Sequence, residues 1–346
     1  MKRLIRFTIA LTALQFGIRN SELAMAQDIH FSQFYETSIL RNPALVGIFT
    51  DDYKLTAVYR NQWSSIGKPF TTGLGSAEFR VPIGREAVNF ISFGLLGYSD
   101  KAGRAALKTT GVYPALNYNQ SLGDRHNSYV SVGFTGGYVV RSFDASKLSF
   151  DNEYVNGVYL QNSGPGEPLP DGRLQHWDAG AGVSFNSGVG EDNKLNYFIG
   201  LAGYHFSQPR RNFYSGVGIN LNMRWNASLG LHATLNDTWS AELHGNYALQ
   251  GSYQEIVLGG TLRFAGTNDR NRQVTAFAAG VFYRFKDAVV PTVKVDYKGQ
   301  SFGLSYDINL SSLKAATNLQ GGLEATLSFH GLFQGTYDDK HACPRF

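Results

Sequence analysis

Apolar and polar residues alternate along most of this chain. Residues 323–330 read Leu-Glu-Ala-Thr-Leu-Ser-Phe-His, and residues 239–244 read Trp-Ser-Ala-Glu-Leu-His. Successive side chains of a β-strand point to opposite faces, so each such segment has one apolar face and one polar face. The pattern therefore predicts an all-β protein built of amphipathic strands.

Fourteen segments of this kind follow one another from residue 52 onward. We expect strands at 52–63, 70–81, 88–99, 107–122, 128–141, 175–186, 195–206, 219–233, 237–250, 252–265, 273–286, 289–298, 300–310 and 319–331. Bacterial single-chain membrane barrels have an even number of antiparallel strands. The sequence thus predicts a transmembrane antiparallel β-barrel of about 14 strands.

A soluble β-sandwich also alternates apolar and polar residues, so it is the main structural alternative. Two features favour the membrane barrel. The segments exceed the five or six residues of an average soluble strand and suit a tilted crossing of a bilayer. Aromatic residues also recur near segment ends, as in the interfacial girdles of barrels, at Tyr53, Trp63, Tyr98, Tyr129, Trp177, Tyr204, Trp239, Tyr253, Tyr283 and Tyr297.

The links between segments predict an orientation. Residues 142–174 form by far the longest link and contain a Gly- and Pro-rich run. Long loops of these barrels lie outside the cell and short turns lie in the periplasm. With the start of the first strand in the periplasm, this link falls outside, and the turns at 235–238 and 298–300 fall in the periplasm. The charged turn 265–273 is either a solvated turn or a periplasmic contact.

The first residues predict export. Lys2, Arg3 and Arg6 precede a ten-residue apolar run from Phe7 to Phe16, and Ala24-Met25-Ala26 offers a small-x-small cleavage site. Ten residues make only about 15 Å of helix, too short for a membrane anchor. We expect residues 1–26 to be a cleaved signal peptide and the mature protein to reside in the cell outer membrane. Residues 27–51 then form a periplasmic or lumen-filling segment, residues 52–333 the barrel, and residues 334–346 a C-terminal tail.

Charge and cysteine content narrow the classes further. Residues 1–26 hold four basic residues and one acidic residue, so the rest of the chain has 27 basic and 26 acidic residues. This balance gives no reason to expect a nucleic-acid partner. Cys343 is the only cysteine, which excludes a disulfide-stapled scaffold. No later stretch is long and apolar enough for a membrane helix.

No catalytic motif stands out in the sequence. It lacks a Gly-x-Ser-x-Gly nucleophile elbow, and its eight histidines are scattered without metal-ligand spacing. We therefore expect no enzyme activity, no cofactor and no metal. An outer-membrane hydrolase with a spatially assembled Ser–His pair remains a remote alternative.

Three ordered motifs carry a resemblance to a known family. Residues 27–35 read Gln-Asp-Ile-His-Phe-Ser-Gln-Phe-Tyr, residues 42–47 read Asn-Pro-Ala-Leu-Val-Gly, and residues 59–63 read Tyr-Arg-Asn-Gln-Trp. With the ending Cys343-Pro344-Arg345-Phe346, they resemble the PorP/SprF family of type IX secretion and gliding-motility membrane proteins of Bacteroidetes. The middle of the chain matches only in its alternating pattern.

The resemblance implies a non-enzymatic role in protein secretion and gliding. One branch of the family resembles a link from the outer membrane to periplasmic rings, and the other holds secreted adhesins by their C-terminal domains. The expected partners are thus a secreted surface protein or other type IX components, besides the lipid bilayer. The candidate partner-binding or plug residues are His30, Phe31, Ser32, Gln33, Phe34, Asn42, Pro43, Arg60 and Trp63. The rival function is a porin-like channel for small solutes, which requires an open lumen.

Overall fold

The computed structural model describes residues 28–333, with gaps at 66, 85–87, 104–105, 149–153, 156–157, 160–171, 191–192, 212, 214–218, 268–272 and 313. The expected signal peptide and the C-terminal tail lie outside the described residues.

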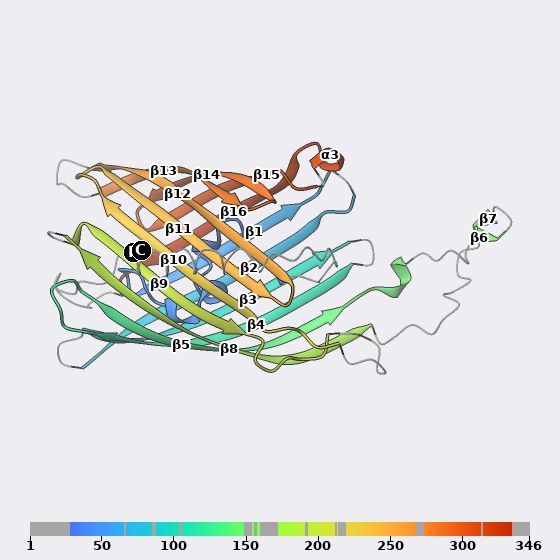
Figure 1. Ribbon diagram of the computed structural model, residues 1–346, viewed down its shortest axis with the longest axis horizontal. Coiled ribbons are helices and arrows are strands. Elements are labelled where there is room, and N and C mark those ends of the chain that lie inside the picture. Colours follow the sequence, from blue (N-terminus) through green and yellow to red (C-terminus); the bar gives the residue numbers. More distant parts are fainter. Residues whose placement is uncertain are drawn as a thin grey trace, which may run out of the picture.

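Fourteen antiparallel strands close into a barrel (Figure 1). In chain order they are β1 (Tyr53–Gln62), β2 (Phe70–Ile83), β3 (Asn89–Ala102), β4 (Leu107–Ser121), β5 (Tyr129–Ser142), β8 (Arg173–Val189), β9 (Leu195–Tyr204), β10 (Arg224–Thr234), β11 (Trp239–Gln250), β12 (Tyr253–Thr267), β13 (Gln273–Arg284), β14 (Ala288–Tyr297), β15 (Gln300–Asn309) and β16 (Gln320–Gly331). The barrel closes where β1 pairs with β16, from Tyr53 opposite Gly331 to Gln62 opposite Gly322. The predicted fold class and strand number are confirmed.

The remaining described elements are short. A two-stranded sheet of β6 (Tyr154–Val155) and β7 (Val158–Tyr159) belongs to the link between β5 and β8, as does the 3-10 turn η3 (Ala145–Lys147). The single turn α3 (Lys314–Thr317) lies between β15 and β16, and η1, α2 and η2 precede β1. No helix of the described chain is long and apolar enough to cross a membrane.

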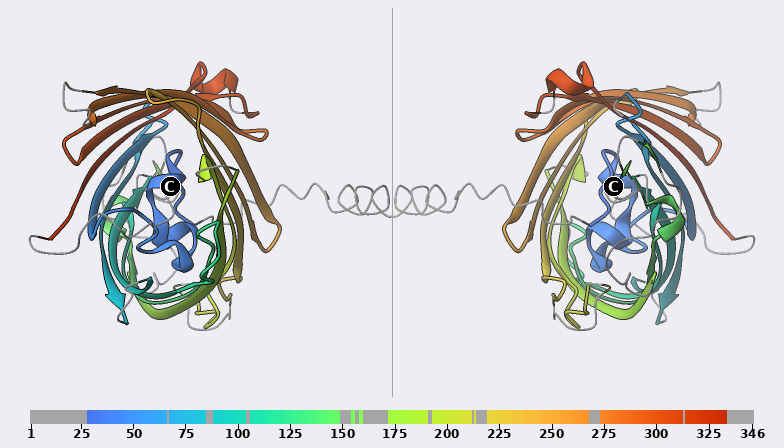
Figure 2. Two further views of the ribbon diagram at one scale, coloured as in Figure 1. Left: turned by 90° about the vertical axis from the view of Figure 1, so that its left-hand side faces the viewer. Right: turned by 90° about the vertical axis from the view of Figure 1, so that its right-hand side faces the viewer.

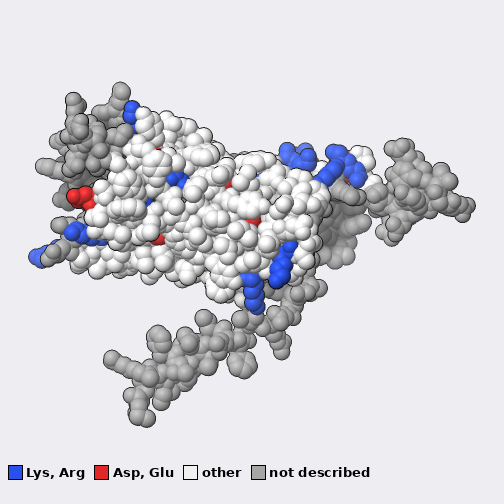
Figure 3. Space-filling model, turned by 90° about the horizontal axis from the view of Figure 1, so that it is seen from above, with Lys and Arg blue, Asp and Glu red and all other residues white. Residues whose placement is uncertain are grey.

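The distribution of buried residues is the reverse of that in a soluble protein. On β16, Leu327 is 40% exposed whereas Glu324 is 1% exposed. The outer wall carries the apolar set of each strand, and Figure 3 shows a middle zone of one face with few charged residues. Polar and charged side chains fill the lumen instead. This arrangement suits a wall whose outer solvent is lipid, and it excludes the sandwich alternative.

The aromatic residues correct one expectation. Trp177, Trp239, Tyr283 and Tyr297 are exposed on the outer wall, as girdle residues should be. Tyr129 and Tyr204 are buried, and Tyr98 packs against an internal apolar cluster, so these three rings do not belong to a girdle. Position near a strand end does not reveal which face a ring occupies, because that depends on the parity of the strand.

The two ends of the barrel differ in their links. One end, hereafter the loop end, holds the links 63–69, 103–106, 143–172, 205–223, 251–252, 285–287 and 310–319. The opposite end, hereafter the turn end, holds only 84–88, 122–128, 190–194, 235–238, 268–272 and 298–299. The segregation follows the parity expected from the sequence. The strand expected at 219–233 begins later, at Arg224; before it, Asn220 forms a bridge with Arg210, and the Leu221 N–H donates to the Pro209 carbonyl oxygen.

Candidate functional site in the barrel lumen

Residues 28–52 occupy the interior of the barrel. Viewed along the barrel in Figure 2, this blue segment lies within the ring of strands. It forms three short turns, η1 (Phe34–Glu36), α2 (Ser38–Arg41) and η2 (Pro43–Leu45). It runs from Asp28, beside the loop-end residue His205, to the turn end where β1 begins. We call residues 28–52 the lumen segment.

A buried charge network fixes the lumen segment nearer the loop end. Arg60 on β1 contacts Asp307 on β15 at 2.7 Å and Glu324 on β16 at 2.8 Å. Glu324 accepts hydrogen bonds from the backbone N–H groups of Ser32 and Gln33 at 2.8 and 2.7 Å. Glu324 therefore binds the backbone of the lumen segment, while Arg60 neutralises the charge of its carboxylate.

The Ser32 hydroxyl group lies at the centre of this network. It donates to Asp307 at 2.5 Å and accepts from Arg60 at 2.5 Å and from Arg284 on β13 at 2.7 Å. Arg284 also contacts Asp307 at 3.1 Å. A buried ion pair is costly to break because the remaining charge loses its partner in a low-dielectric setting. The network thus holds Ser32 firmly in place.

Asn42 and Arg41 attach the middle of the lumen segment to the opposite wall. The Asn42 side-chain amide donates to the carbonyl oxygens of Val183 on β8 and Leu201 on β9 at 3.1 and 3.4 Å. Its side-chain oxygen accepts from the Ala44 N–H, which caps η2 ahead of Pro43. Arg41 donates to carbonyl oxygens of β10 and β11, and its guanidinium group lies 4.9 Å from the Phe34 and Phe198 ring centroids.

The barrel wall is shaped to receive this segment. A Cβ atom at Gly133 on β5 would collide with the Pro43 carbonyl group, and one at Gly182 on β8 would collide with the Asn42 side chain. Glycine is the only residue that permits so close an approach of backbone or side chain at these positions. The fit indicates a packed seat for the lumen segment.

Apolar and aromatic side chains complete the packing. Phe31 is buried in a cluster with Ile39, Val46, Val58 and Leu96. Phe34 meets Phe282 of β13 edge to face at 5.8 Å. Tyr35 stacks on Phe282 at 5.0 Å and on His244 at 5.1 Å.

Two further ion-pair groups attach the lumen segment to the wall, one toward each end of the barrel. At the turn end, Glu36 contacts Lys54 at 3.1 Å and Lys294 at 2.6 Å. At the loop end, His205 lies between Asp28 at 2.5 Å and Asp178 at 2.8 Å. Burial acts to lower the pKa of His205, but the carboxylates of Asp28 and Asp178 prevail and raise it to about 9. Burial likewise acts to raise the pKa of Asp28, but His205 holds it well below its usual range.

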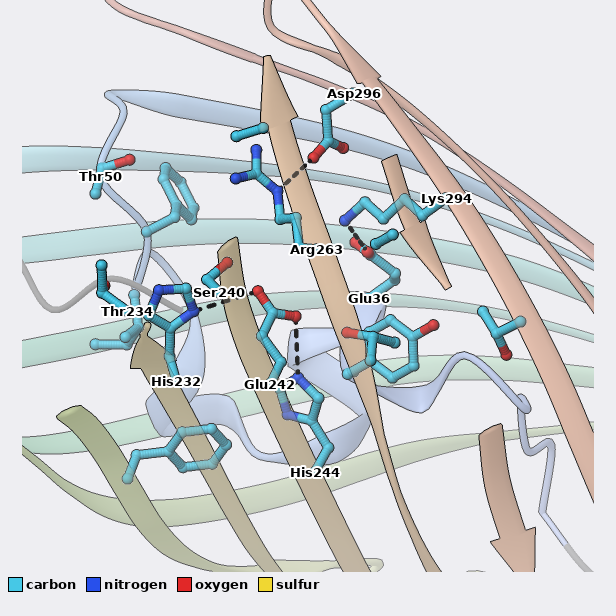
Figure 4. A pocket seen from close by; sticks show the side chains of 18 of the residues that line it. Glu36, Thr50, His232, Thr234, Ser240, Glu242, His244, Arg263, Lys294 and Asp296 are labelled. Atoms are coloured by element: carbon cyan, nitrogen blue, oxygen red, sulfur yellow. Dashed lines mark hydrogen bonds and ion pairs between the residues drawn. The ribbon is translucent and has the colours of Figure 1, made fainter. Parts of the chain in front are cut away.

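A polar cavity of about 670 Å³ opens beneath the lumen segment at the turn end (Figure 4). Glu242 lies between His232 and His244, at 3.4 and 3.7 Å, and Arg263 contacts Asp296 at 3.1 Å. These charges are therefore already paired within the wall. No group of residues suited to hold a metal ion occurs in the described chain.

The structure places seven of the nine sequence candidates in the lumen segment. These are His30, Phe31, Ser32, Gln33, Phe34, Asn42 and Pro43, and they contact the wall or one another as described. His30 lies near the charges of Glu255 and Arg284. Arg60 is 1% exposed and faces the lumen. Trp63 lies apart from them at the loop-end rim, where it packs on Phe70 at 4.9 Å.

Sequence reasoning missed the wall residues that hold these candidates. Asp307, Glu324 and Arg284 are isolated charges on strands, and each occupies an inward position of its alternation. A charge at an inward position among small polar residues was the available signal. Neither their contact with one another nor that of Asp28 with His205 can be read from residues so distant in the sequence.

The chain was compared with known proteins. Residues 24–329 match the model of a family described as the type IX secretion system membrane protein PorP/SprF. No curated protein sequence matches the chain. The toluene transporter TbuX of Ralstonia pickettii aligns with a TM-score of 0.50 and 10% identity over 86% of this chain and 94% of its own. The monoaromatic hydrocarbon channel CymD gives 0.50 and 11% over 87% and 94%. At these identities the likeness establishes only the barrel fold.

Proposed function

Because the chain belongs to the PorP/SprF family of type IX secretion system membrane proteins, we propose that it is a non-enzymatic accessory barrel that binds a protein partner of that system. The partner is a secreted surface protein, held by its C-terminal domain, or a periplasmic component of the machinery. Binding supports secretion or surface attachment of the secreted protein.

The observation that carries the proposal is the occupied lumen. A porin conducts solutes through an open polar bore. Here the lumen segment is bound to the wall at Ser32, at Asn42 and at Glu36, by charges and hydrogen bonds that are buried or partly buried. A lumen segment bound to the wall at three places does not suit an open solute channel. It favours a role in which the barrel presents surfaces to other proteins.

The two ends of the barrel suit different partners. We place the loop end outside the cell, since its links at 143–172 and 205–223 are the longest of the chain. A secreted protein would meet this end. A periplasmic partner would meet the turn end, where the 670 Å³ cavity presents Glu36, Lys294 and Asp296.

Affinity purification of a tagged native copy, followed by mass spectrometry, tests the proposal. The expected result is recovery of one or a few large exported proteins or of type IX components. A photo-crosslinker at residue 146 in the loop end and another at 237 in the turn end would assign the partner to an end. Solute conductance in planar bilayers with no co-purifying protein would favour the porin alternative.

A further inference from the structure

The two ends of the barrel differ in surface charge. Among the described residues, the exposed basic residues of the loop end are Lys68, Lys101, Lys108, Lys147, Arg173, Arg210, Lys286 and Lys314, whereas those of the turn end are Arg125, Lys194 and Lys298. The exposed acidic residues of the described chain, Asp124 and Asp237, both lie at the turn end. Two partly exposed carboxylates of the loop end are already paired, Asp144 with Lys147 and Asp287 with Arg284. On the face in Figure 3, Lys and Arg stand without neighbouring acidic residues at the right-hand end, which is the loop end.

Three of these basic residues form one row around the outside of the barrel. Lys101 on β3 lies directly opposite Lys108 on β4, Lys108 lies opposite Ser142 on β5, and Ser142 lies opposite Arg173 on β8. Each shares the strand parity of exposed apolar residues, such as Leu95, Val112 and Trp177, so each faces outward. We call Lys101, Lys108 and Arg173 the basic row.

The described part of the chain offers the basic row no counter-charge. Like charges directly opposite one another on neighbouring strands destabilise a sheet. Within the described chain, none of the three forms an ion pair with a carboxylate. An external anion would remove the repulsion between Lys101 and Lys108.

The surface below the basic row is apolar. On β3 and β4, Phe93, Leu95, Val112 and Leu116 are 49, 52, 47 and 46% exposed. Tyr138 and Trp177, an outward ring pair at 4.9 Å, mark the level of the membrane interface. On β8, Arg173 lies four residues before Trp177, or about 13 Å farther along the strand toward the loop end. The three cations therefore lie at the depth of headgroups, next to a wall that contacts acyl chains.

We propose that the basic row binds the phosphate-bearing headgroup of a lipid of the outer leaflet, whose acyl chains lie along the apolar surface below it. A lipid fits better than a soluble anion because cationic and apolar surfaces are continuous. It fits better than a protein because the row faces sideways into the membrane, away from the loops. The orientation proposed above, with the loop end outside, places this row in the outer leaflet.

The test uses the full-length protein purified in detergent, with diphosphoryl lipid A as the probe and native mass spectrometry as the readout. The double variant Lys101→Glu/Lys108→Glu should lower the affinity for lipid A by about thirtyfold or more, as expected for losing two basic residues near an anionic headgroup and adding two acidic ones. The matched control is Lys194→Glu/Lys298→Glu, which makes the same charge change at two exposed turn-end residues and should retain lipid A. Phosphatidylethanolamine should bind all three proteins equally.

Two further arms keep the proposal falsifiable. Arg173→Gln changes one exposed side chain and should weaken lipid A binding severalfold if Lys101/Lys108 variants fail to fold. Inorganic phosphate at millimolar concentration should not displace lipid A, since it lacks the apolar part. Unchanged lipid A binding in the basic-row variants, an equal loss in the turn-end control, or displacement by phosphate alone would each overturn the proposal.

Discussion

Arg60 shows how a residue can be recognised from the sequence while its partners cannot. Its position in the Tyr59–Trp63 motif marked it as a candidate. The structure buries it against Asp307, Glu324 and Ser32. Because side chains alternate along a strand and Tyr59 points outward, Arg60 is expected on the inner face. Its wall partners Asp307 and Glu324, however, lie 247 and 264 residues away in the sequence.

Removing Arg60 should destabilise the folded barrel. Arg60→Ala leaves Glu324 and part of Asp307 without a counter-charge inside the lumen, and we expect a loss of about 3–5 kcal/mol in the free energy of unfolding. Arg263→Ala is the matched control, because the Arg263–Asp296 pair is partly exposed and should contribute much less. Urea unfolding in detergent micelles measures both. Equal effects of the two substitutions would contradict the assigned role of the network.

His205 gives the lumen segment a defined pH range of attachment. The raised pKa of His205, about 9, means that its contribution is complete below about pH 6.5 and is lost as the pH rises through 9. The lowered pKa of Asp28 means that its contribution is present above about pH 4 and is lost at strongly acidic pH.

Hydrogen exchange of residues 28–31, corrected for its intrinsic pH dependence, should therefore show less protection at pH 10 than at pH 6. The full pKa shift of His205 corresponds to roughly 3 kcal/mol, and because Asp178 on the wall supplies part of it, the loss of protection should be smaller than this. His205→Asn should abolish the difference, whereas His126→Asn, at an exposed histidine of the turn end, should preserve it. The same protection at both pH values in the unmodified protein would refute the attachment of the lumen segment through the Asp28–His205 pair.

At the scale of elements, the strands were more predictable than the lumen segment. Alternation over ten to fifteen residues identifies a strand because every second residue lies on the same face, so that many positions support one assignment. The lumen segment has no such period, since its three turns each pack against a different part of the wall. One local feature was predictable, because a residue that precedes a proline, as Asn42 precedes Pro43, avoids the helical region. Asn42 is extended, with a ψ of 121°.

The seat of the lumen segment can be tested with two glycines of one strand. Gly133→Ala on β5 should displace Pro43 and destabilise the protein by about 1–3 kcal/mol, as overpacking does. Gly136→Ala on the outer face of the same strand has nothing within 4 Å of its new Cβ atom and should change stability little. Thermal unfolding, followed by the gel shift between unboiled and boiled samples, compares them. If both variants behave alike, the proposed tight seat is wrong.

The rings of the lumen segment supply apolar packing. Phe31→Ala and Phe34→Ala remove buried rings and should each cost about 3 kcal/mol or more in unfolding free energy. Phe277→Ala, a ring 56% exposed on the outer wall, is the control. A larger effect of Phe277 in the same detergent unfolding assay would show that the lumen packing contributes less than the structure indicates.

At the scale of the whole molecule, the protein is an outer-membrane barrel of the PorP/SprF family with an occupied lumen. Period-2 alternation, segment length and the even number of segments were sufficient to predict the closed barrel. They could not predict the state of the lumen, because whether residues 28–52 enter it depends on contacts such as Ser32 with Glu324, which no local pattern encodes. A partner-binding role rests on family membership together with this occupancy.

The orientation of the barrel leads to a labelling prediction. An epitope inserted at residue 146, in the link 143–172, should be detected on intact cells. One inserted at 237, in the link 235–238, should be detected only after the outer membrane is opened. The reverse pattern would show that the loop end faces the periplasm.

Our central proposal is that this barrel serves the passage or attachment of proteins rather than the passage of small solutes. Comparative proteomics of culture medium and shaved surface proteins, deletion strain against wild type, tests this claim most directly. The account predicts that one or a few large proteins disappear from the surface or medium, while uptake of small solutes is unchanged. An unchanged secreted and surface proteome with altered solute uptake would contradict it.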